Sequence, residues 1–162
     1  MGPAGTTLVI IKEDILGKVS RKIPSMMDYK THISKGSMFN TPPVFAVYTS
    51  MLTLEWLKNL GGVKAIEEAN DKKSRLIYSE IDLNPLFKGY AVKEDRSMMN
   101  ATFTLENENL KETFDAMCLE AGISGINGHR SVGGYRASMY NALSLDSVKA
   151  LVEVMSELES KA

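Results

Sequence analysis

The chain has 162 residues, of which 44% are hydrophobic and 24% are charged, the balance of a globular domain with enough apolar material for a core. Its formal net charge of −1 argues against nonspecific binding to nucleic acid or to a membrane surface. No run approaches the ~18 apolar residues of a membrane span, and no secretory signal is expected. The single cysteine, Cys118, excludes an intrachain disulfide and fits the reducing cytoplasm. With two separated histidines besides, we predict no metal site.

Residues 1–40 are predicted to contain one strand followed by a long irregular segment. Residues 6–12 form a continuous apolar and β-branched run, which favours a strand buried on both faces. One helical turn is predicted over residues 13–17. Residues 18–40 contain Pro24, Gly36 and several serines, which indicates an ordered loop.

A helix is predicted over residues 44–60. The two prolines before it fit only the first turn of a helix, with Asn40 or Thr41 as the N-cap, and the two glycines after it supply a C-cap. Apolar side chains occupy nearly its whole circumference, so we expect this helix to be buried or to lie in an interface. One strand and one apolar helix have no sheet of their own, which indicates an incomplete domain.

The second part of the chain alternates predicted helices and strands. In chain order these are a helix over 63–79, strands over 86–91 and 98–105, a helix over 110–121, strands over 123–126 and 135–140, and a helix from Ser144. The first of these helices is rich in charges that we interpret as a solvated face: Glu67, Glu68, Asp71, Lys72, Lys73 and Arg75. The order of elements predicts a small α/β layer with helices covering a sheet.

The strongest chemical signal lies in residues 128–141, GHRSVGGYRASMYN. His129, Arg130 and Arg136 lie close together here, in a chain that has only five arginines. The planar fork of an arginine matches the oxygens of a carboxylate or a phosphate. The segment therefore predicts binding of a small doubly anionic molecule. The alternative is a surface loop whose arginines pair with the protein's own acids.

The run GHRSVGGYRASMYNA closely resembles the C-terminal signature of the phosphoserine aminotransferase family, whose members use pyridoxal phosphate. The stretches GPAG (2–5), GSMFNTPP (36–43) and WLK…GGV (56–63) match the same family in order and spacing, so the resemblance covers essentially the whole chain. It implies an α/β transferase of fold type I, the aspartate aminotransferase-like fold. Residues 1–64 would be the C-terminal remnant of the cofactor-binding large domain with its connecting helix, and residues 65–162 the small C-terminal α/β domain.

The resemblance also implies roles for five residues. Arg136 corresponds to the family's arginine for the substrate α-carboxylate. His129 and Arg130 correspond to the pair that contacts the substrate phosphate or the distal carboxylate of glutamate. Asn40 and Thr41 correspond to residues that bind the cofactor phosphate from the neighbouring subunit of a homodimer. The alternatives are structural: Arg136 in an ion pair, His129 as a loop cap, and Asn40 or Thr41 as a helix cap.

In this family the Schiff-base lysine lies just upstream of the segment that GPAG matches, so this chain resembles the C-terminal portion and carries no catalytic residue of its own. The parent enzyme would exchange an amino group between glutamate and 3-phosphohydroxypyruvate for serine biosynthesis, with a related vitamin B6 reaction as a further activity. We expect the 162 residues alone to be inactive. The alternative function is a noncatalytic α/β module that binds a phosphorylated small acid.

Overall fold

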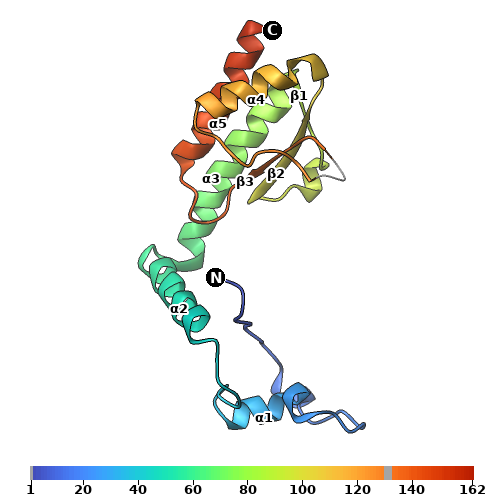
Figure 1. The fold of residues 1–162 in the computed structure, drawn as a ribbon, viewed down its shortest axis with the longest axis vertical. Helices are drawn as coiled ribbons and strands as arrows, with labels where there is room; N and C mark the ends of the chain where they lie inside the picture. Colours follow the sequence, from blue (N-terminus) through green and yellow to red (C-terminus); the bar gives the residue numbers. More distant parts are fainter. Residues whose placement is uncertain (1, 130–132) are drawn as a thin grey trace. The chain divides into compact units, whose positions relative to one another are not determined.

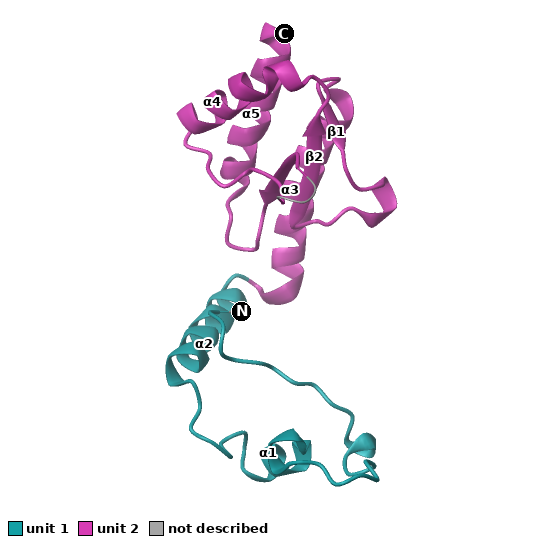
Figure 2. Cartoon of the chain, turned by 45° about the vertical axis from the view of Figure 1, so that its right-hand side comes forward, with its two compact units in different colours: residues 1–60 teal, residues 61–162 magenta. Residues whose placement is uncertain are grey.

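The structure, a computed structural model, describes residues 2–129 and 133–162. It divides into two compact units, Met1–Leu60 and Gly61–Ala162, shown in Figure 2. The boundary between the units lies between Leu60 and Gly61 in the sequence. The predicted domain boundary lies between residues 64 and 65, which is inside the helix Gly62–Leu83. The assignment of the two halves to a large and a small domain stays a prediction.

The first unit has little regular structure before its main helix. It contains the 3-10 helices η1 (Glu13–Ile15) and η2 (Ser25–Met27) and the helices α1 (Tyr29–Ser34) and α2 (Val44–Asn59). The turn predicted over 13–17 is confirmed by η1. The prediction that residues 18–40 are only a loop is wrong for η2 and α1; Asp28 caps α1 by accepting a hydrogen bond from the Lys30 amide at 3.0 Å.

The strand predicted over residues 6–12 does not form. Leu8 is 68% exposed and Ile10 is 91% exposed, and no described residue pairs with this segment. A β-strand needs neighbouring strands to receive its backbone hydrogen bonds, and unit 1 has none in its described residues. The β-branched composition of residues 6–12 favours a strand, but the described residues of unit 1 contain no other strand with which it could pair.

The apolar helix predicted over 44–60 is confirmed as α2, and Gly61 follows it in the left-handed conformation with φ 104°. The expectation that the helix could be buried within the chain is wrong. Ala46 is its only buried residue, and Phe45 is 76% exposed. An interface with another molecule or segment remains the prediction.

Unit 2 is a sheet of three antiparallel strands covered on one face by three helices (Figure 1). Its elements, in chain order, are α3 (Gly62–Leu83), β1 (Phe87–Gly89), η3 (Lys93–Asp95), β2 (Asn100–Leu105), η4 (Glu108–Leu110), α4 (Lys111–Glu120), β3 (Tyr135–Ser138) and α5 (Leu145–Lys161). The predicted order of helices and strands is confirmed except at 123–126. That segment forms no strand. Its Ile126 carbonyl accepts from the Arg136 amide at 2.7 Å, its Ile123 amide donates to the Cys118 carbonyl at 2.8 Å, and the isolated bridge to Tyr135 is made by the next residue, Asn127.

The core of unit 2 lies between the sheet and its helices. Four aromatic rings form its centre: Phe87, Phe103, Phe114 and Tyr135, with ring centroids 4.9–5.7 Å apart in the contacting pairs. Cys118 of α4 is buried with them, as expected of a small apolar side chain, and burial raises the pKa of its thiol to about 11. Helix α5 begins as predicted, with Ser144 Oγ accepting from the Ser147 amide at 3.1 Å.

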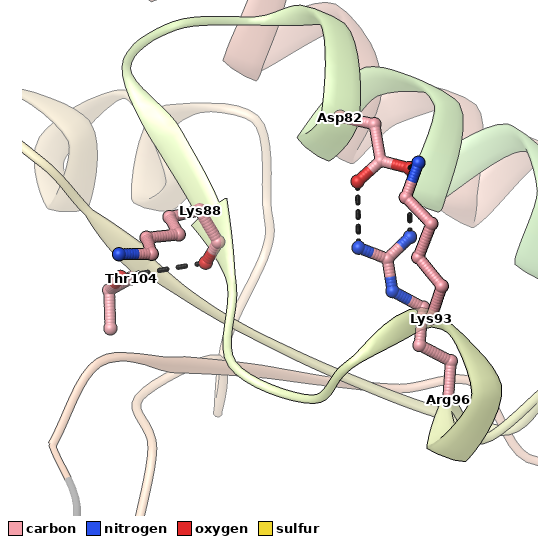
Figure 3. Close-up of polar contacts among 5 residues, drawn as sticks. All are labelled: Asp82, Lys88, Lys93, Arg96 and Thr104. Atoms are coloured by element: carbon pink, nitrogen blue, oxygen red, sulfur yellow. Dashed lines mark hydrogen bonds and ion pairs between the residues drawn. The ribbon is translucent and has the colours of Figure 1, made fainter.

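A salt-bridge cluster joins the end of α3 to the segment before β2 (Figure 3). Both guanidinium Nη atoms of Arg96 donate to the Asp82 carboxylate, at 2.9 and 2.7 Å, and Lys93 adds a contact at 3.2 Å. The hydrogen bond from Arg96 is the main cause that lowers the pKa of Asp82. Figure 3 also shows Thr104, whose hydroxyl donates to the Lys88 carbonyl of the neighbouring strand at 3.5 Å.

Helix α3 corrects one sequence interpretation. Its charged residues Glu67, Glu68, Lys72 and Arg75 are exposed, as a solvated face requires. Lys73 is not: it is only 2% exposed and is among the largest fully buried side chains. Lys73 precedes Ile77 by four residues, so the helical period places both on the same face of α3, and Ile77 is fully buried. Lys72, one position earlier, points about 100° away.

Candidate anion site on strand β3

The glycine-rich turn before β3 is closed by its own backbone. The Gly128 amide donates to the Gly134 carbonyl and the Gly133 amide to the His129 carbonyl, each at 2.8 Å. A Cβ atom at Gly128 would lie 2.0 Å from the Gly133 oxygen, so a side chain there is incompatible with this closure. Gly134 has φ +64°, a conformation that side chains disfavour. The glycines thus bring His129 back beside the start of β3.

His129 and Arg136 line the same hollow, of about 150 Å³. The rest of its lining comes from the turn and from the strands beside it: Tyr90, Thr102, Phe103, Thr104, Gly128, Gly133 and Tyr135. The structure therefore brings together two of the three residues that the sequence predicts for the anion. The third, Arg130, lies outside the described residues.

Arg136 is on the open face of the sheet. Its neighbours Tyr135 and Ala137 are buried, so the alternation of a strand directs Arg136 to the face opposite the helices. In register it pairs with Thr102 of β2. No carboxylate among residues 2–129 and 133–162 forms an ion pair with it. The alternative that Arg136 is consumed by an internal ion pair therefore finds no support in the described part of the chain.

Tyr135 anchors the strand that carries Arg136. Its ring stacks on Phe103 at 5.5 Å, and its hydroxyl donates to Asp115 Oδ1 of α4 at 2.9 Å. Lys111 contacts the other oxygen of Asp115 at 2.6 Å. Burial, followed by the bond to Asp115, raises the pKa of Tyr135, so this phenol stays protonated and donating at neutral pH.

A second, larger hollow of about 390 Å³ runs along the outer edge of β3. Residues 121–126, β3 and the first turns of α5 line it, and Arg136 belongs to its lining as well. Arg136 is thus accessible from two sides of the strand. Sequence reasoning missed the hydroxyl residues Thr102 and Thr104, although their alternation with buried residues in 100–105 is the signal that places them on the open face.

Asn40 and Thr41 lie in unit 1 and are both exposed. The side-chain Nδ2 of Asn40 donates to the Thr41 carbonyl at 3.1 Å. Neither residue caps α2, because that helix begins at Val44 and its N-cap is Pro43, with no capping hydrogen bond from a side chain. The predicted cap is therefore wrong. The first-turn N–H groups of α2 keep their capacity to bind an anion.

Other kinds of site have no counterpart in the described residues. Among residues 2–129 and 133–162, no three histidine, cysteine or acidic side chains gather in a way that could hold a metal ion. No described helix has the length and apolar character that crossing a bilayer demands.

Comparison with known proteins identifies the family. The model of the class-V aminotransferases matches residues 1–151. The chain belongs to the class-V aminotransferase family. Membership confirms the predicted fold type I of the pyridoxal-phosphate-dependent transferases, and the mixed helices and sheet of the structure agree with it.

The similar curated proteins of this family are named phosphoserine aminotransferase. The protein of Flavobacterium psychrophilum is 68% identical over 161 residues, and that of Porphyromonas gingivalis is 52% identical over 163 residues. Each alignment covers 99% of this chain but only 45% of the relative. The chain thus spans somewhat less than half the length of these class-V aminotransferases.

Solved structures similar to this chain are also phosphoserine aminotransferases. A phosphoserine aminotransferase studied for radiation damage of its Schiff base has a TM-score of 0.89 at 46% identity, covering 99% of this chain and 45% of its own. The pyridoxal-phosphate-bound phosphoserine aminotransferase of Trichomonas vaginalis has a TM-score of 0.74 at 37% identity, covering 85% and 40%.

Proposed function

We propose that this chain is the C-terminal portion of a phosphoserine aminotransferase. The complete enzyme transfers an amino group from glutamate to 3-phosphohydroxypyruvate and yields 2-oxoglutarate and O-phosphoserine, a step of serine biosynthesis. The same anion site would admit a related phosphorylated substrate of vitamin B6 biosynthesis. The observation that carries the proposal is that His129 and Arg136 line one hollow, in a chain whose relatives bear this name.

Arg136 binds the α-carboxylate that both amino-acid substrates share. Its fork donates two parallel hydrogen bonds, which fix the plane of the carboxylate and so restrict the orientation of the neighbouring amino group. The position on a strand suits this role, because Tyr135 and Ala137 on either side are held in the core. The absence of an ion pair with any described acid supports it.

His129 and Arg130 bind the other end of the substrate. That end is a phosphate in O-phosphoserine and a carboxylate in glutamate, so one subsite accepts anions of different size and charge. An imidazole on a glycine-closed turn and a guanidinium adjust to either. The hydroxyls of Thr102 and Thr104, which line the same hollow, are additional donors.

The cofactor of the complete enzyme is pyridoxal phosphate, which supplies the electron sink of transamination. The residues present fit its phosphate group. Asn40 and Thr41 precede a 16-residue helix whose N-terminus has no side-chain cap, and both side chains are exposed. A phosphate there would meet free N–H groups and the positive end of the helix dipole. In the homodimer this site serves the neighbouring subunit, in the cytoplasm.

The 162 residues alone are inactive in transamination, because none of them stands where the family has its cofactor-binding lysine. The test compares the isolated chain with the full-length enzyme in turnover of O-phosphoserine with 2-oxoglutarate. We expect turnover by the full-length enzyme and none above free cofactor by the isolated chain. Turnover by protein whose mass shows that it begins at Met1 would contradict the assignment.

The alternative, a noncatalytic module for a phosphorylated small acid, has its own signature. It predicts that the isolated chain binds O-phosphoserine through His129 and Arg136 with an affinity equal to that of any longer form. Binding that appears only in the full-length dimer would favour the aminotransferase. Calorimetric titration of both forms separates the two functions.

A further inference from the structure

The buried lysine of α3 holds the segment that follows β3. Lys73 Nζ donates to three backbone carbonyls, those of Met139 at 3.1 Å, Tyr140 at 2.9 Å and Leu143 at 3.1 Å. An ammonium has three donors and no acceptor, so these three bonds satisfy it completely. We call residues 139–143 the post-β3 turn; in Figure 1 it lies beside α3.

Lys73 has no counter-charge among residues 2–129 and 133–162. No carboxylate of the described residues forms a salt bridge with it, and burial lowers its pKa. An ammonium removed from water without an ionic partner is costly, and its cost here is offset only by the dipoles of the three carbonyls. The Met139 carbonyl depends on the lysine in return, because its bond to Lys73 is buried and a carbonyl left there without a donor would be costly. The bonds to the Tyr140 and Leu143 carbonyls are only partly buried.

A second bond ties the same turn to α3. Asn70, one helical turn before Lys73 and also buried, donates from Nδ2 to Asn141 Oδ1 at 2.8 Å. The turn is closed internally by the Leu143 amide, which donates to the Tyr140 carbonyl at 2.9 Å. Two side chains of α3, Lys73 and Asn70, therefore hydrogen-bond to four of the five residues of the post-β3 turn.

The turn begins three residues after Arg136. Strand β3 has only four residues and lies at the edge of the sheet, where the Arg136 amide makes its outer bond to Ile126. Beyond the strand, the Met139 amide continues the pairing by donating to the Met99 carbonyl at 2.8 Å. The carbonyl of that same residue is one that Lys73 holds. Release of the turn thus loosens the C-terminal end of the strand on which Arg136 sits.

We propose that Lys73, assisted by Asn70, is a positioning residue. By holding the post-β3 turn it fixes the position of the Arg136 guanidinium, and thereby the affinity of the site for its carboxylate ligand. The inference rests on the proposed function. A misplacement of about 1 Å in a group that orients a substrate lowers activity by up to about a hundredfold. Lys73 itself touches no substrate.

The test uses the full-length enzyme with Lys73→Met, which keeps the length of the side chain and removes the three donors. We expect the KM for both glutamate and O-phosphoserine to rise about tenfold, with a smaller change in kcat, because ground-state binding is what Arg136 supplies. In hydrogen exchange, amides of residues 136–143 should lose protection. The matched control is Lys72→Met, an exposed neighbour on the same helix, which should leave both measurements unchanged.

If Lys73→Met does not fold, Asn141→Ala tests the same idea from an exposed residue, and it should shift KM and exchange in the same direction to a lesser extent. A folded Lys73→Met enzyme with unchanged KM for both substrates would overturn the proposal, even if exchange increases, because the lysine would then be structural only. A wild-type enzyme without aminotransferase activity would instead refute the proposed function. The claim about substrate affinity would fall with it, while exchange would still show whether Lys73 holds the turn.

Discussion

The two units of this chain use similar apolar side chains with opposite results. In unit 2, Phe103, Phe114 and Tyr135 lose almost all their exposure in a core between sheet and helices. In unit 1, Phe45 and Ile10 remain in solvent, and α2 buries only Ala46. Hydrophobic residues stabilise a fold only where another layer covers them. Unit 2 contains both layers, whereas unit 1 supplies one side of a packing arrangement.

Core truncation should separate the two units most strongly. We expect Phe114→Ala, at a residue with no exposure, to lower the free energy of unfolding of unit 2 by about 3–5 kcal/mol. The matched change in unit 1, Phe45→Ala, should alter the stability of the 162-residue chain by only about 0.5 kcal/mol, because its ring is already in water. Urea denaturation followed by circular dichroism measures both. Equal losses would mean that α2 is packed in the isolated chain.

The anion site should respond to the geometry of its arginine. We expect Arg136→Lys in the full-length enzyme to raise the KM for both amino-acid substrates, a loss of about 1–3 kcal/mol for a charged hydrogen bond. Arg75→Lys is the control, since that side chain is 80% exposed in an α3 surface pair. Normal kinetics in Arg136→Lys would show that Arg136 is not the carboxylate anchor.

Removing a helix cap should also affect the two units differently, with a smaller loss of stability than core truncation. Ser144→Ala removes a cap bond of α5 and should cost about 1 kcal/mol in thermal or urea unfolding. Thr41→Ala should leave stability unchanged, because Thr41 caps nothing in α2. In the proposed full-length homodimer, however, the double change of Asn40 and Thr41 to alanine should weaken retention of pyridoxal phosphate. A double variant that retains the cofactor normally would remove these residues from the proposed site.

The smallest expected effect is a pH dependence at Asp82. Because its pKa in the folded chain lies below the ordinary 3.8, the stability it contributes is present above 3.8 and is lost as the pH falls through its folded value. We expect at most about 1 kcal/mol, since the pair is partly exposed. Unfolding curves of the wild type and Asp82→Asn should converge at acid pH. A difference that persists to the lowest pH would indicate a contribution other than the ion pair.

Short-range patterns in the sequence were sufficient to predict where the helices α2 and α5 begin. The apolar residues of 44–60 predict α2 nearly to the residue, and Ser144 predicts where α5 begins, because both signals act within one or two turns. The motif at 128–141 likewise predicts anion chemistry, since glycines and arginines carry that meaning locally. The proposed reaction came from the resemblance to a family, because helical and strand periodicities carry no information about a reaction.

Tertiary structure decided what depends on a partner distant in sequence. Residues 6–12 have the composition of a strand but pair with no described strand. Residues 123–126 form no strand either, and only Asn127 beside them makes an isolated bridge, because pairing requires a free neighbouring strand. Lys72 and Lys73 are adjacent and identical in the sequence. One is in solvent and the other is buried, because only the fold brings three carbonyls from the post-β3 turn to the position of Lys73.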